Sequence, residues 1–382
     1  MALKNKYQRE KQQYTNDSGR TWIDVSPANY RRGRLIEAGS EDCNTVEWRE
    51  VTGSWFCSGY VPPTPTIQTY LTIQSLEDNN TIGFKCNLNN VKRTISISTD
   101  NGVTWTGKTS STSGKILATL NTGEKMLIKG DNSSYATSGT TEGSYNYFTS
   151  TKQFVLEGNI MSLINSTNFE NLNTLTSERT FYRLFYNCSK LVSAENLSLP
   201  AMTLTRDCYG SMFVSCTSLT TAPALPAITL ASNCYYGMFH NCSSLTTAPE
   251  LPATTLANYC YRYMFWQCKS LTSAPSVLPA TTLADGCYYD MFAVCTSLTT
   301  APALPATTLV DRCYSGMFDG CTKLSYIKAM FLTDPNYQSN NVYTLNWVRD
   351  VAASGTFVKN SQATWNLTGD DGIPTGWTVV TE

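Results

Sequence analysis

The chain has few of the residues that catalytic centres use. Its 382 residues include one histidine, His240, so a histidine-based triad cannot be assembled within it. No Cys-x-x-Cys pair accompanies that histidine, which disfavours a zinc site. No glycine-rich phosphate-binding loop occurs either. We therefore predict a protein that is not an enzyme and that holds no cofactor and no metal.

Charged residues are also scarce. They make up 15% of the chain, and the formal net charge is −1. This composition argues against capture of nucleic acid or of an anionic membrane surface. No stretch reaches membrane-spanning length, so we expect no membrane insertion. The first ten residues lack the apolar run of a secretory signal, which favours assembly in a cytoplasm.

The chain does contain a 26-residue repeat, which is present in five copies between residues 200 and 330. Each copy reads Cys-Tyr-x-x-Met-Phe-x-x-Cys-x-x-Leu, followed by a segment rich in Thr, Ala and Pro. A diverged copy occupies residues 180–191. Repeats of this length predict a stack in which each unit buries its apolar face against its neighbours. The first cysteine of each copy is Cys208, Cys234, Cys260, Cys287 or Cys313.

The spacing within one copy is compatible with a helix. At roughly 100° per residue, the five fixed residues of the second copy fall on one apolar face, and the residues that differ between copies fall on the other. Residues 245–249 are too short for a helix and contain a proline, so they predict a short strand. The fixed residues are Cys234, Tyr235, Met238, Phe239 and Cys242.

The repeat cysteines are expected to be buried thiols. Eight helical residues would separate the two Cα atoms of a pair by about 12 Å, beyond the reach of about 7 Å that a disulfide tolerates. Small thiols that let repeats approach closely are the alternative. Cys43, Cys57 and Cys86 lie outside the repeats, and their pairing stays open.

Residues 65–157 alternate between apolar and polar side chains, as half-buried strands do. Strands are predicted at 69–73, 82–86, 94–98 and 125–129, and an antiparallel β-sandwich is the natural fit. Such a domain binds carbohydrate or acts as a spacer, and the sequence leaves both open.

The pattern Ser/Thr-x-Asp-x-Gly-x-Thr-Trp occurs at residues 15–22 and again at 98–105. It predicts a hairpin tip in which Asp100 caps turn amides, Gly102 takes a positive φ and Trp105 packs beneath. The pattern resembles the Asp-box of sialidases, which in those enzymes is a structural hairpin away from the catalytic centre.

The predicted fold class is α+β and multidomain. A small N-terminal β module and the β-sandwich precede a leucine-rich-repeat solenoid that has a helix and a short strand in each repeat. A short helix is expected at 343–351, and strands at 355–359 and 376–380. The predicted domains are an N-terminal attachment module (1–64), the sandwich (65–157), an N-terminal cap (158–190), the repeats (191–330) and a C-terminal cap (331–382).

The repeats resemble the BspA-like leucine-rich-repeat family through the Phe-x-x-Cys-x-x-Leu run that starts at Phe239 and the Leu251-Pro252 turn. The Thr-Thr-Ala-Pro segment departs from that family, which usually places Ile or Val there, so weak, short strands are expected. The resemblance implies binding rather than catalysis. It also implies a place on bacterial surfaces or in phages of gut Bacteroidales.

The outward positions of the repeats form the candidate ligand-binding surface. Neutral drift at exposed helix positions usually yields Lys, Glu and Gln, yet here Tyr and Trp collect on adjacent repeats. Aromatic planes beside Asn, Gln and Asp are typical of sugar or protein recognition. Two alternatives stay open: the outward residues vary by neutral drift on a solvent-exposed face, or a neighbouring subunit covers them. The candidates are Asn233, Tyr236, His240, Asn241, Tyr259, Arg262, Tyr263, Trp266, Gln267, Tyr289, Asp290, Arg312 and Asp319.

Together these features predict a non-enzymatic virion fibre or appendage protein that recognises a host surface, assembled in the host cytoplasm. Its expected partners are a host cell-surface glycan or protein and, through residues 1–64, other virion proteins. A homo-oligomer stays open. The alternatives are a bacterial cell-surface adhesin of the same fold and a purely structural virion decoration protein.

Overall fold

The computed structural model describes residues 69–88, 91–137, 144–335 and 342–382, and the backbone of short strands before residue 58. The chain divides into two compact units, residues 1–68 and 69–382. In the first unit, β1 and β2 flank the earlier Asp-box-like segment, whose residues 15–22 lie outside the described ones, as do Cys43 and the side chain of Cys57. The described antiparallel pairs are β1 (Gln13–Tyr14) with β2 (Ile23–Asp24), β3 (Tyr30–Arg31) with β4 (Arg34–Leu35), and β5 (Trp48–Val51) with β6 (Ser54–Cys57).

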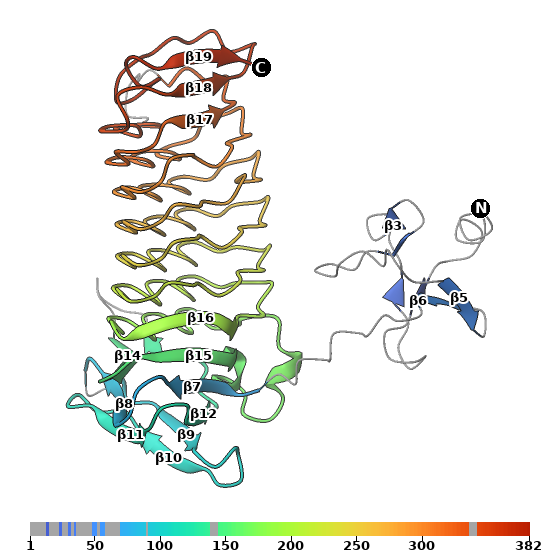
Figure 1. Cartoon of the computed structure of the whole chain (residues 1–382), viewed down its shortest axis with the longest axis vertical. Coiled ribbons are helices and arrows are strands. Elements are labelled where there is room, and N and C mark those ends of the chain that lie inside the picture. The colour runs from blue at the N-terminus through green and yellow to red at the C-terminus, as the bar shows by residue number, and fades with distance from the viewer. Residues whose placement is uncertain are drawn as a thin grey trace. The chain divides into compact units, whose positions relative to one another are not determined.

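Two β-sheets begin the second unit (Figure 1). One has the order β10-β9-β12-β7-β15-β16, and the other β11-β8-β14-β13. The four strands predicted from alternation are confirmed as β7, β8, β9 and β12. The strands are β7 (Leu71–Ser75), β8 (Asn80–Cys86), β9 (Thr94–Ser98), β10 (Thr106–Thr109), β11 (Lys115–Leu120), β12 (Lys125–Lys129), β13 (Ala136–Thr137), β14 (Ser144–Ser150), β15 (Phe154–Asn159) and β16 (Leu191–Ser198).

The hairpin tip between β9 and β10 has the predicted geometry. The Asp100 carboxylate accepts hydrogen bonds from the Thr104 amide at 2.9 and 3.0 Å, and Gly102 has a φ of 88°. Trp105 donates from Nε1 to the Gly102 carbonyl at 3.0 Å, and its ring packs against Tyr70. Hydrogen bonds from the side chains of Ser98 and Thr104 lower the pKa of Asp100 to about 2. This segment stabilises a turn.

One hydrophobic core runs from the sheets into the repeats. β15 pairs in parallel with β16, which connects the first sheet to the stack. The core continues from Leu71 in β7 to Trp377 near the C-terminus. Between β15 and β16 lie two short 3-10 helices, η3 (Ile160–Leu163) and η4 (Phe169–Asn171). The segments predicted as sandwich, caps and repeats therefore share a single core within one compact unit.

The predicted helix-plus-strand solenoid is wrong. The described residues contain no α-helix, and the segment after each first cysteine is a series of tight turns. Every fourth residue of the segment is left-handed: φ is 56° at Asn233, 55° at Gly237 and 58° at Asn241. A right-handed helix cannot accommodate such residues, so the chain bends back on itself every four residues. We call each such turn segment a rung.

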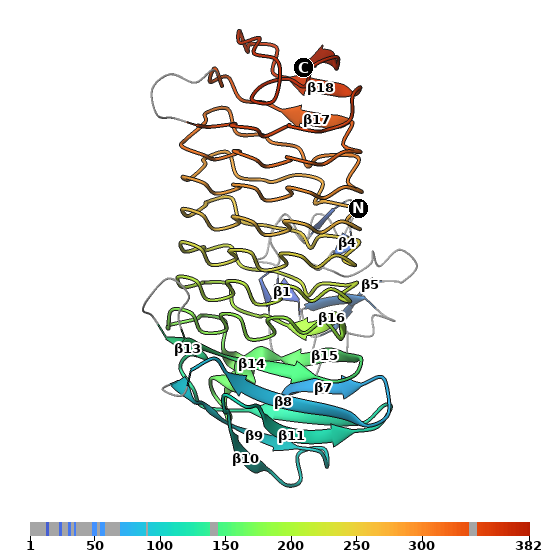
Figure 2. The same cartoon turned by 90° about the vertical axis from the view of Figure 1, so that its left-hand side faces the viewer.

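Backbone hydrogen bonds alternate along a rung. The Tyr236 and Met238 amides close turns within the rung, donating to the carbonyls three residues earlier at 3.0 and 3.1 Å. The Tyr235 and Gly237 amides instead donate to the next rung, to Cys260 at 3.0 Å and to Arg262 at 2.8 Å. Successive rungs lie one above another as a result (Figure 2). Every second amide of a rung thus depends on the following copy.

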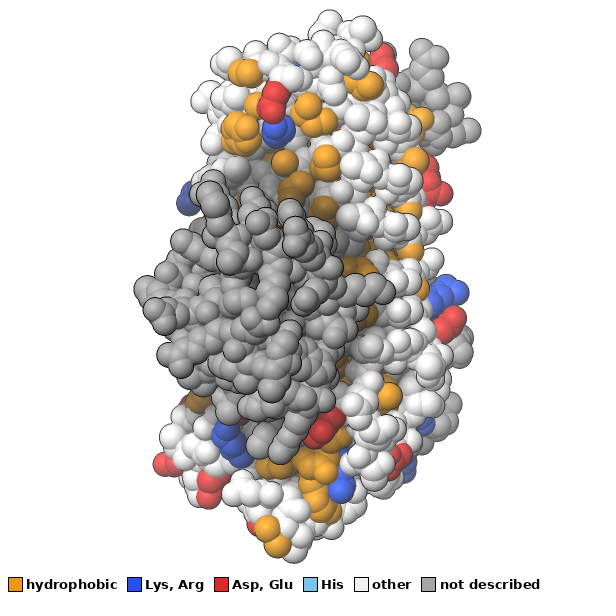
Figure 3. Space-filling view, turned by 90° about the vertical axis from the view of Figure 1, so that its right-hand side faces the viewer, with side chains coloured by type: hydrophobic (Ala, Val, Ile, Leu, Met, Phe, Trp, Pro, Cys, Tyr) orange, Lys and Arg blue, Asp and Glu red, His pale blue; other side chains and the backbone are white. Residues whose placement is uncertain are grey.

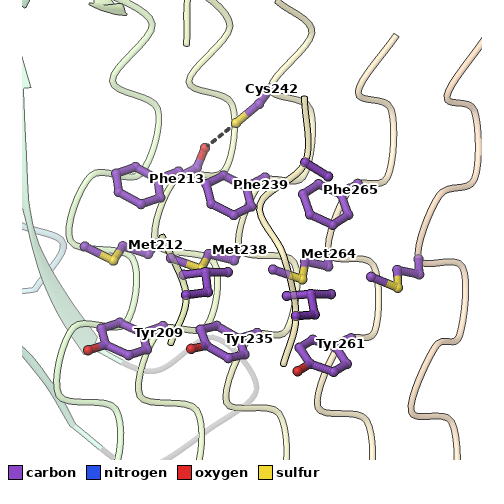
Figure 4. Close-up of a cluster of buried hydrophobic side chains, with 14 of the residues drawn as sticks. Tyr209, Met212, Phe213, Tyr235, Met238, Phe239, Cys242, Tyr261, Met264 and Phe265 are labelled. Carbon is purple, nitrogen blue, oxygen red and sulfur yellow. Dashed lines mark hydrogen bonds between the residues drawn. The ribbon is translucent and has the colours of Figure 1, made fainter. Parts of the chain in front are cut away.

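The fixed side chains form three buried columns through the stack (Figure 4). Tyrosine rings stack from Tyr209 to Tyr314 at 5.7–5.8 Å between centroids. Phenylalanine rings stack from Phe185 to Phe318 at 5.4–5.9 Å, and the methionines lie between the two columns. The prediction that invariant positions are buried is therefore confirmed, although the backbone that buries them is not a helix.

The second cysteine of each repeat links two rungs. Cys242 donates from Sγ to the carbonyl of Phe213 on the preceding rung at 3.1 Å, and its four equivalents make the same contact at 3.1–3.2 Å. All repeat cysteines are buried free thiols, as predicted, and Cys86 is one too. Burial raises the pKa of Cys242 far above its ordinary value, which keeps the thiol protonated and unreactive.

The opposite side of each repeat carries isolated parallel bridges, such as Thr247 with Ser273. These match the expected weak, short strands. The helix predicted at 343–351 is wrong, because Asn346 and Asp350 are left-handed and this segment forms a last rung with Trp347 buried. The two predicted terminal strands are found. The closing parallel sheet consists of β17 (Tyr326–Ala329), β18 (Thr356–Lys359) and β19 (Thr378–Thr381).

Val294 provides a test of the rung geometry. It is a β-branched residue at a φ of 62°, a conformation that costs such residues about 1–2 kcal/mol. We expect Val294→Asn to raise the free energy of unfolding by about 1 kcal/mol, because asparagine tolerates this conformation. Denaturant unfolding of the whole chain measures the difference. The matched control is Val214→Asn, one position earlier in its own rung and not left-handed, where no gain is expected.

Candidate functional site

Large side chains gather on one side of the stack, outside the buried columns. The turns of a rung place two residues inward and the next two outward, so the outward positions are the second, third, sixth and seventh after the first cysteine. On three successive rungs these positions carry tyrosine, tryptophan, histidine and arginine. All are partly exposed, as predicted. We call this surface the aromatic face. It consists of six residues at these positions and of Tyr259, which directly precedes the first cysteine of its rung; the six are Tyr236, His240, Arg262, Tyr263, Trp266 and Tyr289.

Arg262 lies at the centre of the aromatic face. Its guanidinium carbon is 4.6 Å from the ring centroid of Tyr263 and 4.7 Å from that of Tyr289. The rings of Tyr259 and Tyr236 follow at 5.5 and 5.9 Å. Such distances give cation–π attraction. Nη2 donates to the Tyr263 hydroxyl at 3.0 Å, whereas Nε is enclosed and has no acceptor.

The aromatic rings hold one another in place. Tyr263 meets Tyr236 edge-on at 5.7 Å and Tyr289 edge-on at 5.6 Å. Trp266 packs against His240 at 4.5 Å and against Tyr263 at 5.6 Å. Burial lowers the pKa of His240, so the imidazole is neutral at neutral pH. The result is a set of fixed planes with partly exposed faces.

Glycines on the outward positions receive the large side chains of the rung before. A Cβ atom at Gly286 would lie 2.3 Å from the ring of Tyr259, and one at Gly316 would overlap the carboxylate of Asp290. Tyr259 and Asp290 are therefore each paired with a glycine at the equivalent position of the following rung. The sequence analysis treated these positions as independent and did not predict this pairing. The signal that could have predicted it is a glycine at the equivalent position of the next copy.

The backbone accounts for several of the predicted candidates. Asn233 and Asn241 occupy left-handed positions, where asparagine is favoured whether or not a ligand binds. Gln267 is left-handed too, but that conformation does not favour glutamine. Arg312 and Asp319 lie beyond the aromatic face. Arg312 pairs with Asp311 at 3.6 Å, and Asp319 accepts a hydrogen bond from Arg349 at 2.9 Å. The structure thus brings seven of the candidates together in the aromatic face and places Asn233, Asn241 and Gln267 on the same rungs, whereas Arg312 and Asp319 lie apart on a later rung.

Asp290 lies at the edge of the aromatic face and is partly buried. Burial, followed by repulsion from Asp319, raises its pKa to about 6, although Arg262 and Arg349 act in the opposite direction. The carboxyl is therefore a mixture of protonated and ionised forms just below neutral pH.

The sequence analysis also missed a second arginine cluster, on the diverged first rung. The guanidinium of Arg183 lies 5.0 Å from the ring of Tyr145, 5.2 Å from that of Tyr186 and 5.3 Å from that of Tyr182. Its Nε is likewise enclosed without an acceptor. Tyr145 comes from β14, so only the tertiary fold completes the cluster. The available signal was Tyr182, Arg183 and Tyr186 at the outward positions of the diverged copy.

The two clusters adjoin. Burial raises the pKa of Tyr236, and the positive charges of Arg262 and Arg183 both oppose that shift. Between them lies the rung of Cys208, whose outward positions hold only Gly210, Ser211, Val214 and Ser215. Tyr182 leans over Gly210, where an added Cβ would lie 3.0 Å from its ring. Tyrosine and arginine side chains therefore form one strip from Tyr145 to Tyr289, which we call the Tyr/Arg strip.

The described part of the chain holds no group of three or more His, Cys, Asp or Glu residues placed to bind a metal ion. None of its helical segments has the length and hydrophobicity of a membrane-spanning helix.

In comparisons with known proteins, no family model, no curated protein and no solved structure matched the chain. The resemblance to the BspA-like family therefore stays a prediction.

The raised pKa of Asp290 predicts a pH-dependent effect on stability. Between about pH 4 and 6 the native state binds this proton more readily than the unfolded chain, so the contribution of Asp290 to stability falls as pH rises through 6. Asp290→Asn should therefore stabilise the protein more at pH 7.5 than at pH 4. Denaturant unfolding at both values measures the difference, with the exposed Asp285→Asn as the control for removing one negative charge. An equal effect of Asp290→Asn at the two pH values would contradict this assignment.

Proposed function

We propose that this chain is a non-enzymatic recognition protein whose repeat stack presents the aromatic face to a ligand on a host surface. The observation that carries the proposal is the set of partly exposed aromatic rings fixed edge-on against one another around Arg262. Rings that are already ordered lose little conformational entropy on binding, and they offer both apolar planes and hydroxyl groups.

The rest of the stack is poor in charge. Between residues 200 and 310 the charged residues number seven, and in the side view of Figure 3 acidic and basic side chains are sparse on the described part of the stack. A ligand is therefore recognised by stacking and hydrogen bonding more than by long-range attraction. Carbohydrate fits this surface, because a sugar ring offers one apolar face for a tryptophan and hydroxyls for the amides nearby.

A virion fibre or appendage is the setting we propose, on the basis of the resemblance of the repeats to proteins of phages of gut Bacteroidales. Partners of this class are a host glycan or surface protein, and other virion proteins for residues 1–64. The enrichment in tyrosine, tryptophan and arginine also favours a second candidate, a decoration protein whose aromatic face packs against another virion chain.

Binding to cells of Bacteroidales strains, with a glycan array in parallel, tests the proposal on the full-length chain. We expect Trp266→Ala and Tyr263→Ala each to lower retention by roughly tenfold, since a central aromatic anchor contributes at least about 1.4 kcal/mol. Tyr326→Ala, at a partly exposed tyrosine of β17, is the control and should bind like the parent. Equal retention of all four proteins would remove the aromatic face as the binding site. Retention by purified virions alone would favour the decoration protein.

A further inference from the structure

We infer that the Tyr/Arg strip binds an acidic carbohydrate, a glycan chain that carries carboxylate groups, with Arg183 and Arg262 as its two anion contacts. This inference rests on the proposed function and specifies the chemical class of its ligand. It follows from the charge balance, the unused hydrogen-bonding capacity and the repetition of the two clusters.

The charge balance of the strip is positive. Arg179 and Arg206 share the carboxylate of Asp207, at 3.2 and 3.6 Å, and the described ion pairs of the stack involve neither Arg183 nor Arg262. Asp290 acts on Arg262 only through longer-range attraction. Two guanidinium groups are therefore held by tyrosine rings, without a carboxylate of their own, on a surface that is otherwise nearly uncharged.

The guanidinium group of Arg262 also has donors that no protein acceptor uses. An arginine carries five N–H donors, and Arg262 uses one of them, from Nη2 to Tyr263. Its Nε is enclosed by the rings, which leaves Nη1 and the second proton of Nη2 for a ligand. A carboxylate fits the planar fork of an arginine, and the resulting charge-assisted bonds are stronger than those to a neutral hydroxyl.

Arg183 and Arg262 lie three rungs apart along the stack, and each rung step is about 5.7 Å between stacked rings. The rung of Cys208, which separates the two clusters, carries only small residues at its outward positions, so no bulky side chain interrupts the strip. A polymer that repeats its carboxylates can therefore engage both arginines at once, while its sugar rings lie against the partly exposed Tyr186, Tyr236 and Tyr263. Simultaneous contacts make the binding of the second site effectively intramolecular.

Binding of hexagalacturonate to the full-length chain, followed by calorimetry or affinity electrophoresis, tests the inference. The fully methyl-esterified hexamer, which has the same sugars without charge, is the matched probe. We expect the acid to bind at least roughly tenfold more tightly than the ester. Arg262→Met and Arg183→Met keep an unbranched apolar stem and should each remove most of that preference, and Arg262→Lys should keep part of it. Asp290→Asn, which removes the nearest competing carboxylate, should tighten binding of the acid.

Arg312→Met is the control, because Arg312 lies outside the strip and already pairs with Asp311. An equal loss in this variant would mean non-specific attraction and would overturn the inference, as would equal binding of acid and ester. Binding of sulfated dextran without binding of hexagalacturonate would overturn the carboxylate assignment. Thermal unfolding shows whether each variant is folded. If Arg262→Met does not fold, Arg183→Met and Arg262→Lys still show whether the preference for the acid depends on the arginines. Neutral glycan binding that depends on Trp266 but on neither arginine would reject this inference and leave the proposed function standing.

Discussion

The structure depends on the left-handed residue at every fourth position of a rung. That conformation turns the chain back on itself, so that alternate amides point along the stack and find carbonyls only on the next copy. Hydrogen bonding, ring stacking and the cysteine contact then all run in the same direction, between rungs. A single rung leaves half of its amides unsatisfied and its apolar side chains exposed, so stability is a property of neighbouring rungs together.

Which residues are buried could be predicted from the sequence, but how the backbone buries them could not. Side chains along a rung alternate two inward and two outward, which is a period of four residues, and the fixed residues are the inward ones. The 3.6-residue period of a helix fits a nine-residue segment almost as well. The distinguishing signal was Gly, Asn or Asp recurring every four residues at the outward positions, as in Asn233, Gly237 and Asn241. The same confusion produced the helix predicted around Trp347. The strands β7, β8, β9 and β12 were predictable because a period of two resembles no helix, whereas β10 and β11 were not predicted.

The outward surface was predictable in position and only partly in content. Exposure of Tyr263 and Trp266 followed from their variation between copies. Their packing against Tyr236, His240 and Tyr289 did not, because those contacts join residues 26 or 27 apart on neighbouring rungs. The cluster around Arg183 was harder still to predict, because Tyr145 belongs to a β-sheet that lies outside the repeats. Asn233 and Asn241, which were predicted as ligand-binding groups, are explained in part by backbone conformation.

The pairing of a bulky side chain with a glycine on the following rung limits how the order of the repeats can change during evolution. Gain or loss of a whole 26-residue unit in the gene would preserve the columns of Tyr, Met and Phe, because every copy supplies the same core. It would, however, set Tyr259 or Asp290 against a new neighbour, and only a copy with glycine at that place would accept it. Length can thus change by duplication, whereas the order of the units is constrained by their outer surfaces.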